Sequence, residues 1–352
     1  MIRTWTVATL GVACSAQHPA KETTRAQDAT AIPTDAGKRA AGLAVIPVPL
    51  PGGEGGIGFD DLQYAPELGV LVPAGQSGAL DLIDPASGAI TQITGFSADA
   101  SFGGGHGEGT TSAVAGGGRI YAIDRDVLQL DVVDPATRTF IARAKLAADP
   151  DYVRWIATTG EVWVTEPDAE QIEVFALAPD GTPRAIATIA VRGGPESLVL
   201  SARRAMAYTH LWDGKTVAID VAKRTLTATW PNGCTGSRGI ALDEAHGWLF
   251  VGCAEGKVTV LDVDHDGKQL GAADTGAGVD IIAYGPTRRR LYAPAGKAAT
   301  MAIIEVGDGG TLTTLATVPV AKGSHCAVTD DAGTVWVCDP AKGQLLAVTG
   351  TP

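Results

Sequence analysis

The chain has few aromatic residues and no long apolar run. Aromatic residues make up 5% of its 352 residues, and no window carries the sustained helical spacing of apolar side chains that predicts a long helix. No apolar run reaches the roughly 20 residues that a membrane-spanning helix needs. We therefore expect almost no helix and no transmembrane helix.

Basic charge is also scarce. The sequence holds 27 Lys and Arg against 39 Asp and Glu, for a net charge of −12, and no stripe of basic residues offsets this balance. Nucleic-acid phosphates would be repelled by such a surface. We therefore expect no nucleic-acid partner.

Common catalytic motifs are missing as well. The sequence contains no G-x-S-x-G elbow, no Walker phosphate loop and no C-x-x-C-H haem site. What it does contain is 45 Gly and 20 Pro among 45% hydrophobic residues. That composition predicts many short strands joined by tight turns.

The N-terminus resembles an export signal. Arg3 precedes a short apolar stretch at 5–13, and Gly11-Val12-Ala13-Cys14 resembles a bacterial lipobox. We predict a signal peptide at 1–14 with a lipidated Cys14, then a flexible tether at 15–41 whose composition cannot build a core. An ordinary secretory peptide and a misassigned start are the alternatives. From this signal we expect an outer-membrane or periplasmic lipoprotein, or a secreted protein. We expect contact with a membrane only through the lipid anchor.

The other four cysteines form two local pairs. Cys326 and Cys338 flank a predicted hairpin turn at 330–333, so they should face each other across antiparallel strands. For Cys234 and Cys253 the midpoint misses the turn by about one residue, so that pair should be staggered. Disulfides in these two pairs would agree with export, because they persist in oxidising compartments. The alternative for both pairs is buried reduced thiols.

A sequence pattern that predicts three short strands repeats along the chain. Its clearest copy has strands at 239–242, 248–251 and 258–261, and seven copies lie at 56–97, 104–147, 150–191, 193–231, 233–275, 277–320 and 323–350. Most copies have a fourth strand, but the last does not, and the spare strand at 43–48 can complete it. We predict one all-β domain at 42–352, a monomeric seven-bladed β-propeller of four-stranded blades in which strand 43–48 joins blade seven.

One segment resembles a known family. CTGSRGIALD, LFVGC, VTVLD and GAGVD, within 234–280, are similar to the YVTN-repeat (YncE-like) seven-bladed propellers of bacteria. LFVGC, and LYAPA in the next copy, stand where that family has its LYVTN-like strand. The resemblance implies a scaffold that is often exported and implies no common reaction.

The first residue of each innermost strand should project towards the central channel. Charged residues recur there at intervals of 42 residues, from position 154 to 280. With the equivalent positions of the other blades, the predicted ligand-binding ring is Asp60, Glu108, Arg154, Glu196, Arg238, Asp280 and His325. Alternatively, the alternating charges pair with one another and bind nothing.

A divalent metal is the cofactor that this ring could hold. Blades one, two and seven are neighbours in a closed ring, and they contribute Asp60, His106, Glu108 and His325 with no Arg between them. Two imidazoles and two carboxylates suit Zn²⁺, Mn²⁺ or Fe²⁺. The alternative is a glycine-rich turn with solvated side chains and no cofactor.

Two aromatic segments lie close to this ring in the sequence. Tyr152 and Trp155 flank Arg154, and each either stacks on a ligand at the channel mouth or packs in the core. His210 through Asp213 is expected to form an exposed turn between two strands of blade four.

These observations favour a binding protein over an enzyme. The leading hypothesis is an exported, lipid-anchored propeller that serves as a binding or scaffold module for a protein partner or a small polar ligand at the channel face. The alternative is a metal-dependent hydrolase or lyase, similar to lactonase-type propellers, acting in the channel. Glu196 or Asp280 would then be the base, and Arg154 or Arg238 would stabilise an oxyanion.

Overall fold

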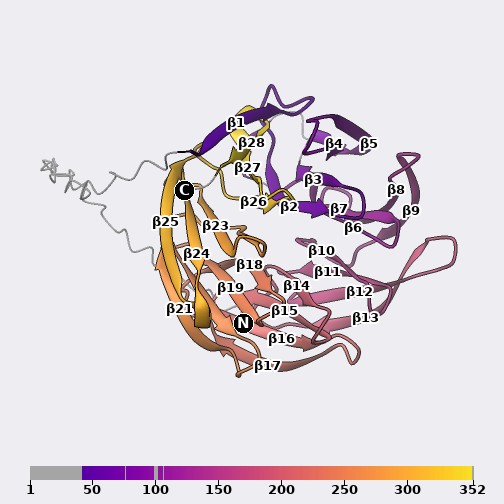
Figure 1. Cartoon of the computed structure of the whole chain (residues 1–352). Helices are drawn as coiled ribbons and strands as arrows, with labels where there is room; N and C mark the ends of the chain where they lie inside the picture. Colours follow the sequence, from indigo (N-terminus) through magenta and orange to yellow (C-terminus); the bar gives the residue numbers. More distant parts are fainter. Residues whose placement is uncertain (1–41, 76, 99–101, 106, 351–352) are drawn as a thin grey trace, which may run out of the picture. The chain divides into compact units, whose positions relative to one another are not determined.

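The computed structural model describes residues 42–75, 77–98, 102–105 and 107–350. The predicted signal peptide with Cys14, the predicted tether and His106 lie outside these residues. Within them, strands form seven antiparallel four-stranded sheets that follow one another around a ring (Figure 1). The predicted seven-bladed β-propeller is therefore confirmed.

Blades one to four each use four consecutive strands, ordered from the channel outwards. Blade one is β2 (Phe59–Ala65), β3 (Val70–Gly75), β4 (Ser77–Ile83) and β5 (Ile90–Ala98). Blade two is β6 (Thr110–Gly116), β7 (Arg119–Asp124), β8 (Gln129–Asp134) and β9 (Thr139–Lys145). Blade three is β10 (Val153–Ile156), β11 (Glu161–Glu166), β12 (Gln171–Leu177) and β13 (Pro183–Ala190). Blade four is β14 (Val199–Ser201), β15 (Met206–Leu211), β16 (Lys215–Asp220) and β17 (Thr225–Pro231).

Blades five and six continue this order, and blade seven departs from it. Blade five is β18 (Ser237–Asp243), β19 (Trp248–Cys253), β20 (Lys257–Asp262) and β21 (Lys268–Asp274). Blade six is β22 (Ala283–Gly285), β23 (Arg290–Ala295), β24 (Thr300–Val306) and β25 (Leu312–Pro319). Blade seven has β26 (Ala327–Thr329), β27 (Val335–Asp339) and β28 (Gln344–Thr349), and its outer strand is β1 (Ala44–Pro49).

The N-terminal strand closes the ring as predicted. β1 pairs antiparallel with β28 over six residue pairs, from Ala44 opposite Thr349 to Pro49 opposite Gln344. This pairing covers the edge of β28 that would otherwise be open to other chains. The β1 side chains are largely exposed, so the strand contributes mainly its backbone hydrogen bonds.

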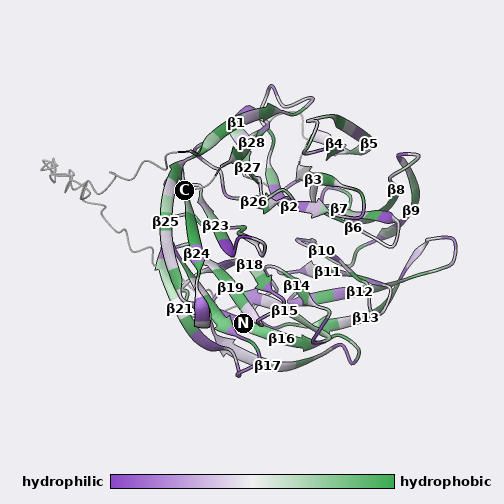
Figure 2. Cartoon of the chain, viewed as in Figure 1, coloured by the Kyte–Doolittle hydropathy of each residue, from purple (hydrophilic) through white to green (hydrophobic). Residues whose placement is uncertain are grey.

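The hydrophobic core lies between neighbouring blades. Seven apolar clusters each span one junction, and the cluster between blades five and six, for example, joins Phe250 and Val260 to Leu291. Figure 2 shows hydrophobic residues concentrated along the strands and hydrophilic ones at the turns. Each sheet therefore buries both faces, which explains the near-continuous apolar runs of the middle strands.

Helix is almost absent from the described residues, as the sequence predicts. It is limited to two short 3-10 turns, Asp308–Gly310 and Pro340–Lys342. None of the helices in this described part is long and apolar enough to span a bilayer.

Both predicted disulfides are present. Cys326 and Cys338 face each other across blade seven with a Cα–Cα distance of 5.6 Å, and the Cys338 N–H donates to the Cys326 carbonyl. Cys234 lies before β18 and reaches Cys253 at the end of β19, with a Cα–Cα distance of 5.3 Å. The second pair is therefore staggered, as its spacing predicts.

Candidate functional site

The predicted ring residues lie where the innermost strands begin. Asp60, Arg154 and Arg238 are the second residues of β2, β10 and β18. Glu108, Glu196, Asp280 and His325 come shortly before the innermost strands of their blades. The seven positions therefore gather at one mouth of the channel.

Two depressions occupy this mouth. The larger has a volume of about 590 Å³ and is lined by Arg238, Asp280 and His325 together with loops of blades five to seven and the loop that precedes blade two. We call it the channel-mouth pocket. The smaller, of about 200 Å³, is lined by Arg125 and Glu196 among residues of blades two to four. The larger volume is within the range of small-molecule sites.

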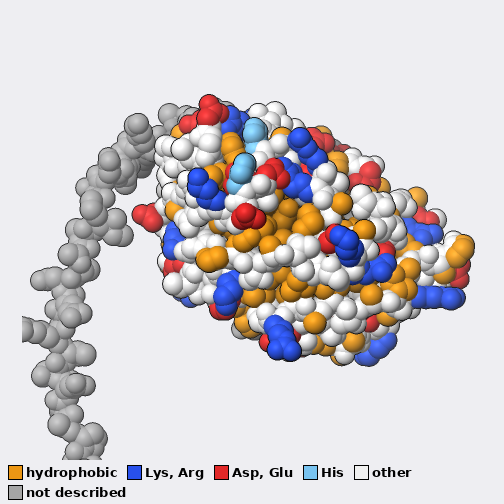
Figure 3. All heavy atoms as spheres, turned by 90° about the horizontal axis from the view of Figure 1, so that it is seen from below, with side chains coloured by type: hydrophobic (Ala, Val, Ile, Leu, Met, Phe, Trp, Pro, Cys, Tyr) orange, Lys and Arg blue, Asp and Glu red, His pale blue; other side chains and the backbone are white. Residues whose placement is uncertain are grey.

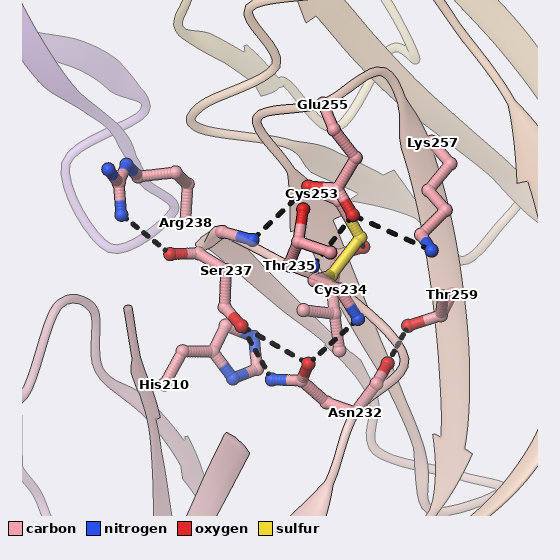
Figure 4. The surroundings of a disulfide bond; sticks show 12 residues. His210, Asn232, Cys234, Thr235, Ser237, Arg238, Cys253, Glu255, Lys257 and Thr259 are labelled. Carbon is pink, nitrogen blue, oxygen red and sulfur yellow. Dashed lines mark hydrogen bonds and ion pairs between the residues drawn. A yellow bond between two sulfur atoms is a disulfide. The ribbon is translucent and has the colours of Figure 1, made fainter. Parts of the chain in front are cut away.

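The backbone around Arg238 is fixed by close packing and a buried polar network. A Cβ at Gly239 would lie 1.9 Å from the Asp280 carbonyl oxygen, so only glycine lets these two blades approach so closely. On the other side, the Asn232 side chain hydrogen-bonds Ser237 and accepts from the Cys234 N–H, beside the disulfide (Figure 4). Arg238 therefore projects from a rigid strand start.

Arg238 contacts blade four. Its Nε lies 3.5 Å from Glu196 Oε1, and its guanidinium lies 5.4 Å from the centre of the Trp212 ring. The Trp212 indole N–H donates to the other Glu196 oxygen. Glu196 and Arg238 form the one neighbouring pair of the predicted alternating set that is in ion-pair contact within the described residues.

Glu196 is held in a setting that disfavours its charge. Burial, followed by the nearby Asp280 charge, raises its pKa from 4.5 to about 8, while Arg238 opposes the shift. Burial also raises the pKa of Asp151, and the charge of Asp60 adds to that shift. The mouth therefore holds two carboxyl groups whose pKa values are raised by burial, a property common at functional sites.

This shift predicts a pH dependence of stability. Between about pH 4.5 and pH 8 the unfolded chain has lost the Glu196 proton while the folded protein retains it, so stability falls as the pH rises through that window. The Glu196→Gln variant is expected to gain about 1–3 kcal/mol over the wild type at pH 8.5 and little at pH 4.5. Guanidinium unfolding at both pH values measures this. A difference that does not change with pH would contradict the buried, protonated carboxyl.

Arg154 does not pair with Glu196, its neighbour in the predicted ring. Its Nη1 lies 2.6 Å from Asp61 Oδ2 of blade one, and its Nε donates to the Leu198 carbonyl of blade four. Asp61 also accepts hydrogen bonds from Ser112 and Gln63. The pair is buried, with exposed side-chain fractions of 13% for Arg154 and 1% for Asp61. It ties four blades together and has a structural role.

A second ion-pair group was missed in the sequence. Arg125, from the end of β7, contacts Asp151 and lies 3.7 Å from Asp60. Neither Arg125 nor Asp151 follows the spacing of 42 residues, because both belong to loops rather than innermost strands. A count of charged loop residues on this face could have found them.

The described members of the predicted metal set do not form a ligand cluster. Both ring nitrogens of His325 face backbone carbonyls. Nδ1 lies 2.6 Å from the Gly323 oxygen, and Nε2 lies 3.0 Å from the Phe59 oxygen. Glu108 is exposed on its loop. Among the described residues, the groups close enough to hold an ion each contain two disulfide-bonded cysteines. His325 belongs to one of these groups, with Cys326 and Cys338, whereas Asp60 and Glu108 belong to neither.

The predicted exposed turn at 210–213 is wrong for His210. This residue lies in β15, is fully buried and contacts the Thr216 hydroxyl, so burial lowers its pKa to about 3. Trp212, by contrast, is 44% exposed. The strand runs further than its apolar residues indicate, and the Thr216 hydroxyl gives the buried imidazole one hydrogen-bond partner, at Nδ1.

The two aromatic residues beside Arg154 have separate roles. Tyr152 is buried, and the Arg154 guanidinium lies 5.1 Å from the centre of its ring. Trp155 stacks on Tyr121 of blade two, with ring centres 5.3 Å apart. Trp155 therefore packs between blades, and Tyr152 supports the ion pair in the channel.

Comparison with known proteins supports the fold. No family model matches the chain, and no curated protein matches it. Among solved structures it is similar to a chain of the Kuenenia stuttgartiensis hydrazine synthase, with a TM-score of 0.68 and 14% identity over 84% of this chain and 96% of that one. It is also similar to a chain of the mitotic checkpoint complex (TM-score 0.69, 12% identity, 100% and 99% coverage) and to U3-55K (0.70, 13%, 88% and 98%).

At these identities the similarity supports the fold and gives no information about activity. The protein is a seven-bladed β-propeller with a concave, charged channel mouth, an architecture compatible with a binding or scaffold module.

Proposed function

We propose that the protein is a binding module that takes a small polar ligand in the channel-mouth pocket. The observation that carries this proposal is the convergence of Arg238, Asp280 and His325 on one cavity of about 590 Å³. Concave sites with a few polar groups among apolar lining are where proteins bind small molecules. The rigid β18 start supplies the preorganised geometry that such a site needs.

A protein partner would use a different kind of surface. Figure 3 shows one side of the domain, on which apolar side chains gather across the middle with charged side chains interspersed around them. Ile186 and Leu226, on the outer strands β13 and β17, are 47% and 41% exposed. Scattered exposed apolar residues are ordinary on soluble proteins, so we assign the function to the concave mouth.

Blocking the pocket tests the proposal. Ala341 lines the pocket and is exposed, so Ala341→Trp should fill it without changing any charge. Ligand-observed NMR with a mixed library of neutral, cationic and anionic fragments should find binders to the wild type and lose them in this variant. Ala86→Trp, an exposed turn residue of blade one, is the matched control and should keep them. Binders that persist in Ala341→Trp, or no binders at all, would refute the proposal.

The binding module is further proposed to be exported and anchored through a lipid on Cys14, as a member of the YVTN-repeat (YncE-like) propellers. Two disulfides support an oxidising compartment. Mass spectrometry of the protein recovered from membranes tests the anchor, since diacylglycerol on Cys14 adds a fixed mass. A mature chain that begins elsewhere, without lipid, would contradict it.

A metal-dependent hydrolase or lyase remains the competing function. The His325 ring nitrogens both face carbonyl oxygens, an orientation that directs neither towards an ion. We therefore predict that elemental analysis of protein purified without added metal finds less than about a tenth of an equivalent of any transition metal or Ca²⁺. A stoichiometric ion that is lost in His325→Ala would favour the enzyme.

A further inference from the structure

The channel-mouth pocket reverses the charge of the chain that surrounds it. The whole sequence has 39 acidic against 27 basic residues, yet the pocket is lined by Arg238, Lys297 and Lys322 against one acid, Asp280. The smaller depression beside it has the opposite balance, with Asp149, Asp151, Asp168 and Glu196 against Arg125. The two depressions therefore differ in their ionisable groups, with basic side chains predominating in the larger and carboxyl groups in the smaller.

Two of the three basic groups of the pocket form no ion pair with the described residues. Lys297 and Lys322 are exposed, and neither forms a salt bridge with any residue that the structure describes. Arg238 donates through Nη1 to the Ser237 carbonyl and approaches Glu196 only at 3.5 Å, which leaves its Nη2 without a described partner. Three cationic side chains thus line one pocket, a setting that favours an anion.

Glu196 neutralises the positive charge of Arg238 only in part. Burial and the Asp280 charge raise the pKa of Glu196 to about 8, so near neutral pH it is mostly protonated. The distance of 3.5 Å is also longer than that of a direct charge-assisted hydrogen bond. An incoming anion would therefore compete with a weak internal partner.

The floor of the pocket is built from backbone. Gly278, Gly296 and Gly323 are joined in a row, since the Gly296 N–H donates to the Gly278 carbonyl and the Gly323 N–H donates to the Gly296 carbonyl, each at 2.9 Å. A Cβ at Gly278 would lie 2.7 Å from the backbone nitrogen of Lys297, so Lys297 packs closely against Gly278. Phe102 adds an aromatic wall. The pocket therefore combines an apolar surface with basic groups at its rim.

We propose that the channel-mouth pocket binds an organic carboxylate, whose charged group meets Arg238, Lys297 and Lys322 while its apolar body lies against Phe102 and the glycine row. This inference rests on the proposed function, because it names the ligand class of the same pocket. The single acid of the lining, Asp280, lies beside blade five, with its backbone carbonyl against Gly239 and Gly252.

A matched series of probes tests the charge. Phenylacetate, phenylacetamide and phenethylamine share an aromatic body and differ in charge, and an NMR titration measures each Kd. We expect phenylacetate to bind in the roughly millimolar range of a fragment and the amide to bind at least about tenfold more weakly. The amine should bind more weakly still. Raising NaCl from about 0.05 M to about 0.5 M should weaken phenylacetate alone.

Charge variants locate the effect. Lys297→Gln combined with Lys322→Gln should weaken phenylacetate by about tenfold or more, since each lysine loses a charged contact. Lys268→Gln, an exposed lysine on the outer strand β21, is the matched control and should leave the Kd unchanged. Both variants should unfold at the same temperature as the wild type.

The outcomes separate this inference from the proposed function. If the amide binds as tightly as the acid, or if the double lysine variant binds phenylacetate normally, the carboxylate assignment is overturned. The same holds if phenylacetate fails to bind at about ten millimolar. In each case fragments that are lost in Ala341→Trp still support a ligand site, whereas binding that survives Ala341→Trp overturns both.

Discussion

Arg154→Ala is expected to lower the free energy of unfolding by about 3–5 kcal/mol. The substitution leaves the Asp61 carboxylate, which is 1% exposed, without its cationic partner in the channel. It also removes the hydrogen bond to the Leu198 carbonyl that links blade three to blade four. Guanidinium unfolding, with the slope of the transition checked for a change, measures the loss.

Arg238→Ala is the matched control for this prediction. Arg238 occupies the equivalent position two blades further on, but its side chain is 32% exposed and its carboxylate partner is 3.5 Å away. Ion pairs of this kind contribute about 1 kcal/mol or less. Equal losses for the two variants would contradict the assignment of a structural role to Arg154 and of a ligand-binding role to Arg238.

Deleting β1 is expected to have the largest effect of any change considered. A chain that begins at residue 50 lacks all six pairs between β1 and β28, which opens the ring and exposes the edge of β28. The seventh blade then has three strands. We expect the melting temperature to fall by more than about 10 °C, or the chain to aggregate, because an open edge invites pairing between molecules.

A chain that begins at residue 42 is the reference for this deletion, because it keeps every strand that the structure describes. Thermal unfolding and light scattering of the two truncated chains provide the comparison. A chain from residue 50 that stays monomeric and melts with the reference would show that the closure is dispensable.

The fold could be predicted from the sequence because it depends on local repeats. Each middle strand is marked by a short apolar run and each turn by Gly, Asp or Pro, and a seven-fold repeat leaves few other arrangements. Even the closure by the first strand follows from counting, since blade seven lacks one strand and 43–48 is spare. The two disulfides followed from hairpin spacing for the same reason.

The partners within the site could not be predicted in this way. The spacing of 42 residues places Arg154 and Glu196 on adjacent blades, but it does not say that Arg154 turns across the channel to Asp61. Side-chain direction depends on packing around the whole ring, and so does the burial of His210. Lys297 and Lys322 were missed because they lie in loops outside the repeated positions, although each stands next to a glycine of the pocket floor.

The metal hypothesis shows the same limit. Residues from blades one, two and seven are neighbours in the ring, but adjacency of blades does not fix the distances between donor atoms, and the four-residue set stays a prediction because His106 lies outside the described residues. The two ring nitrogens of His325 each lie within hydrogen-bond distance of a backbone carbonyl. Chemistry that depends on distances of a few ångströms is decided by loop conformation, which repeat spacing does not encode.

A crystal structure of the protein soaked with a fragment from the screen tests the central claim most directly. We predict that the fragment lies in the channel-mouth pocket, in contact with Arg238 and near Lys297 and Lys322. A second cavity of about 340 Å³, lined by Arg288 and Arg290 between blades six and seven, offers a competing location. A fragment found there, with the channel mouth empty, would contradict the claim that the mouth of the propeller is its ligand site.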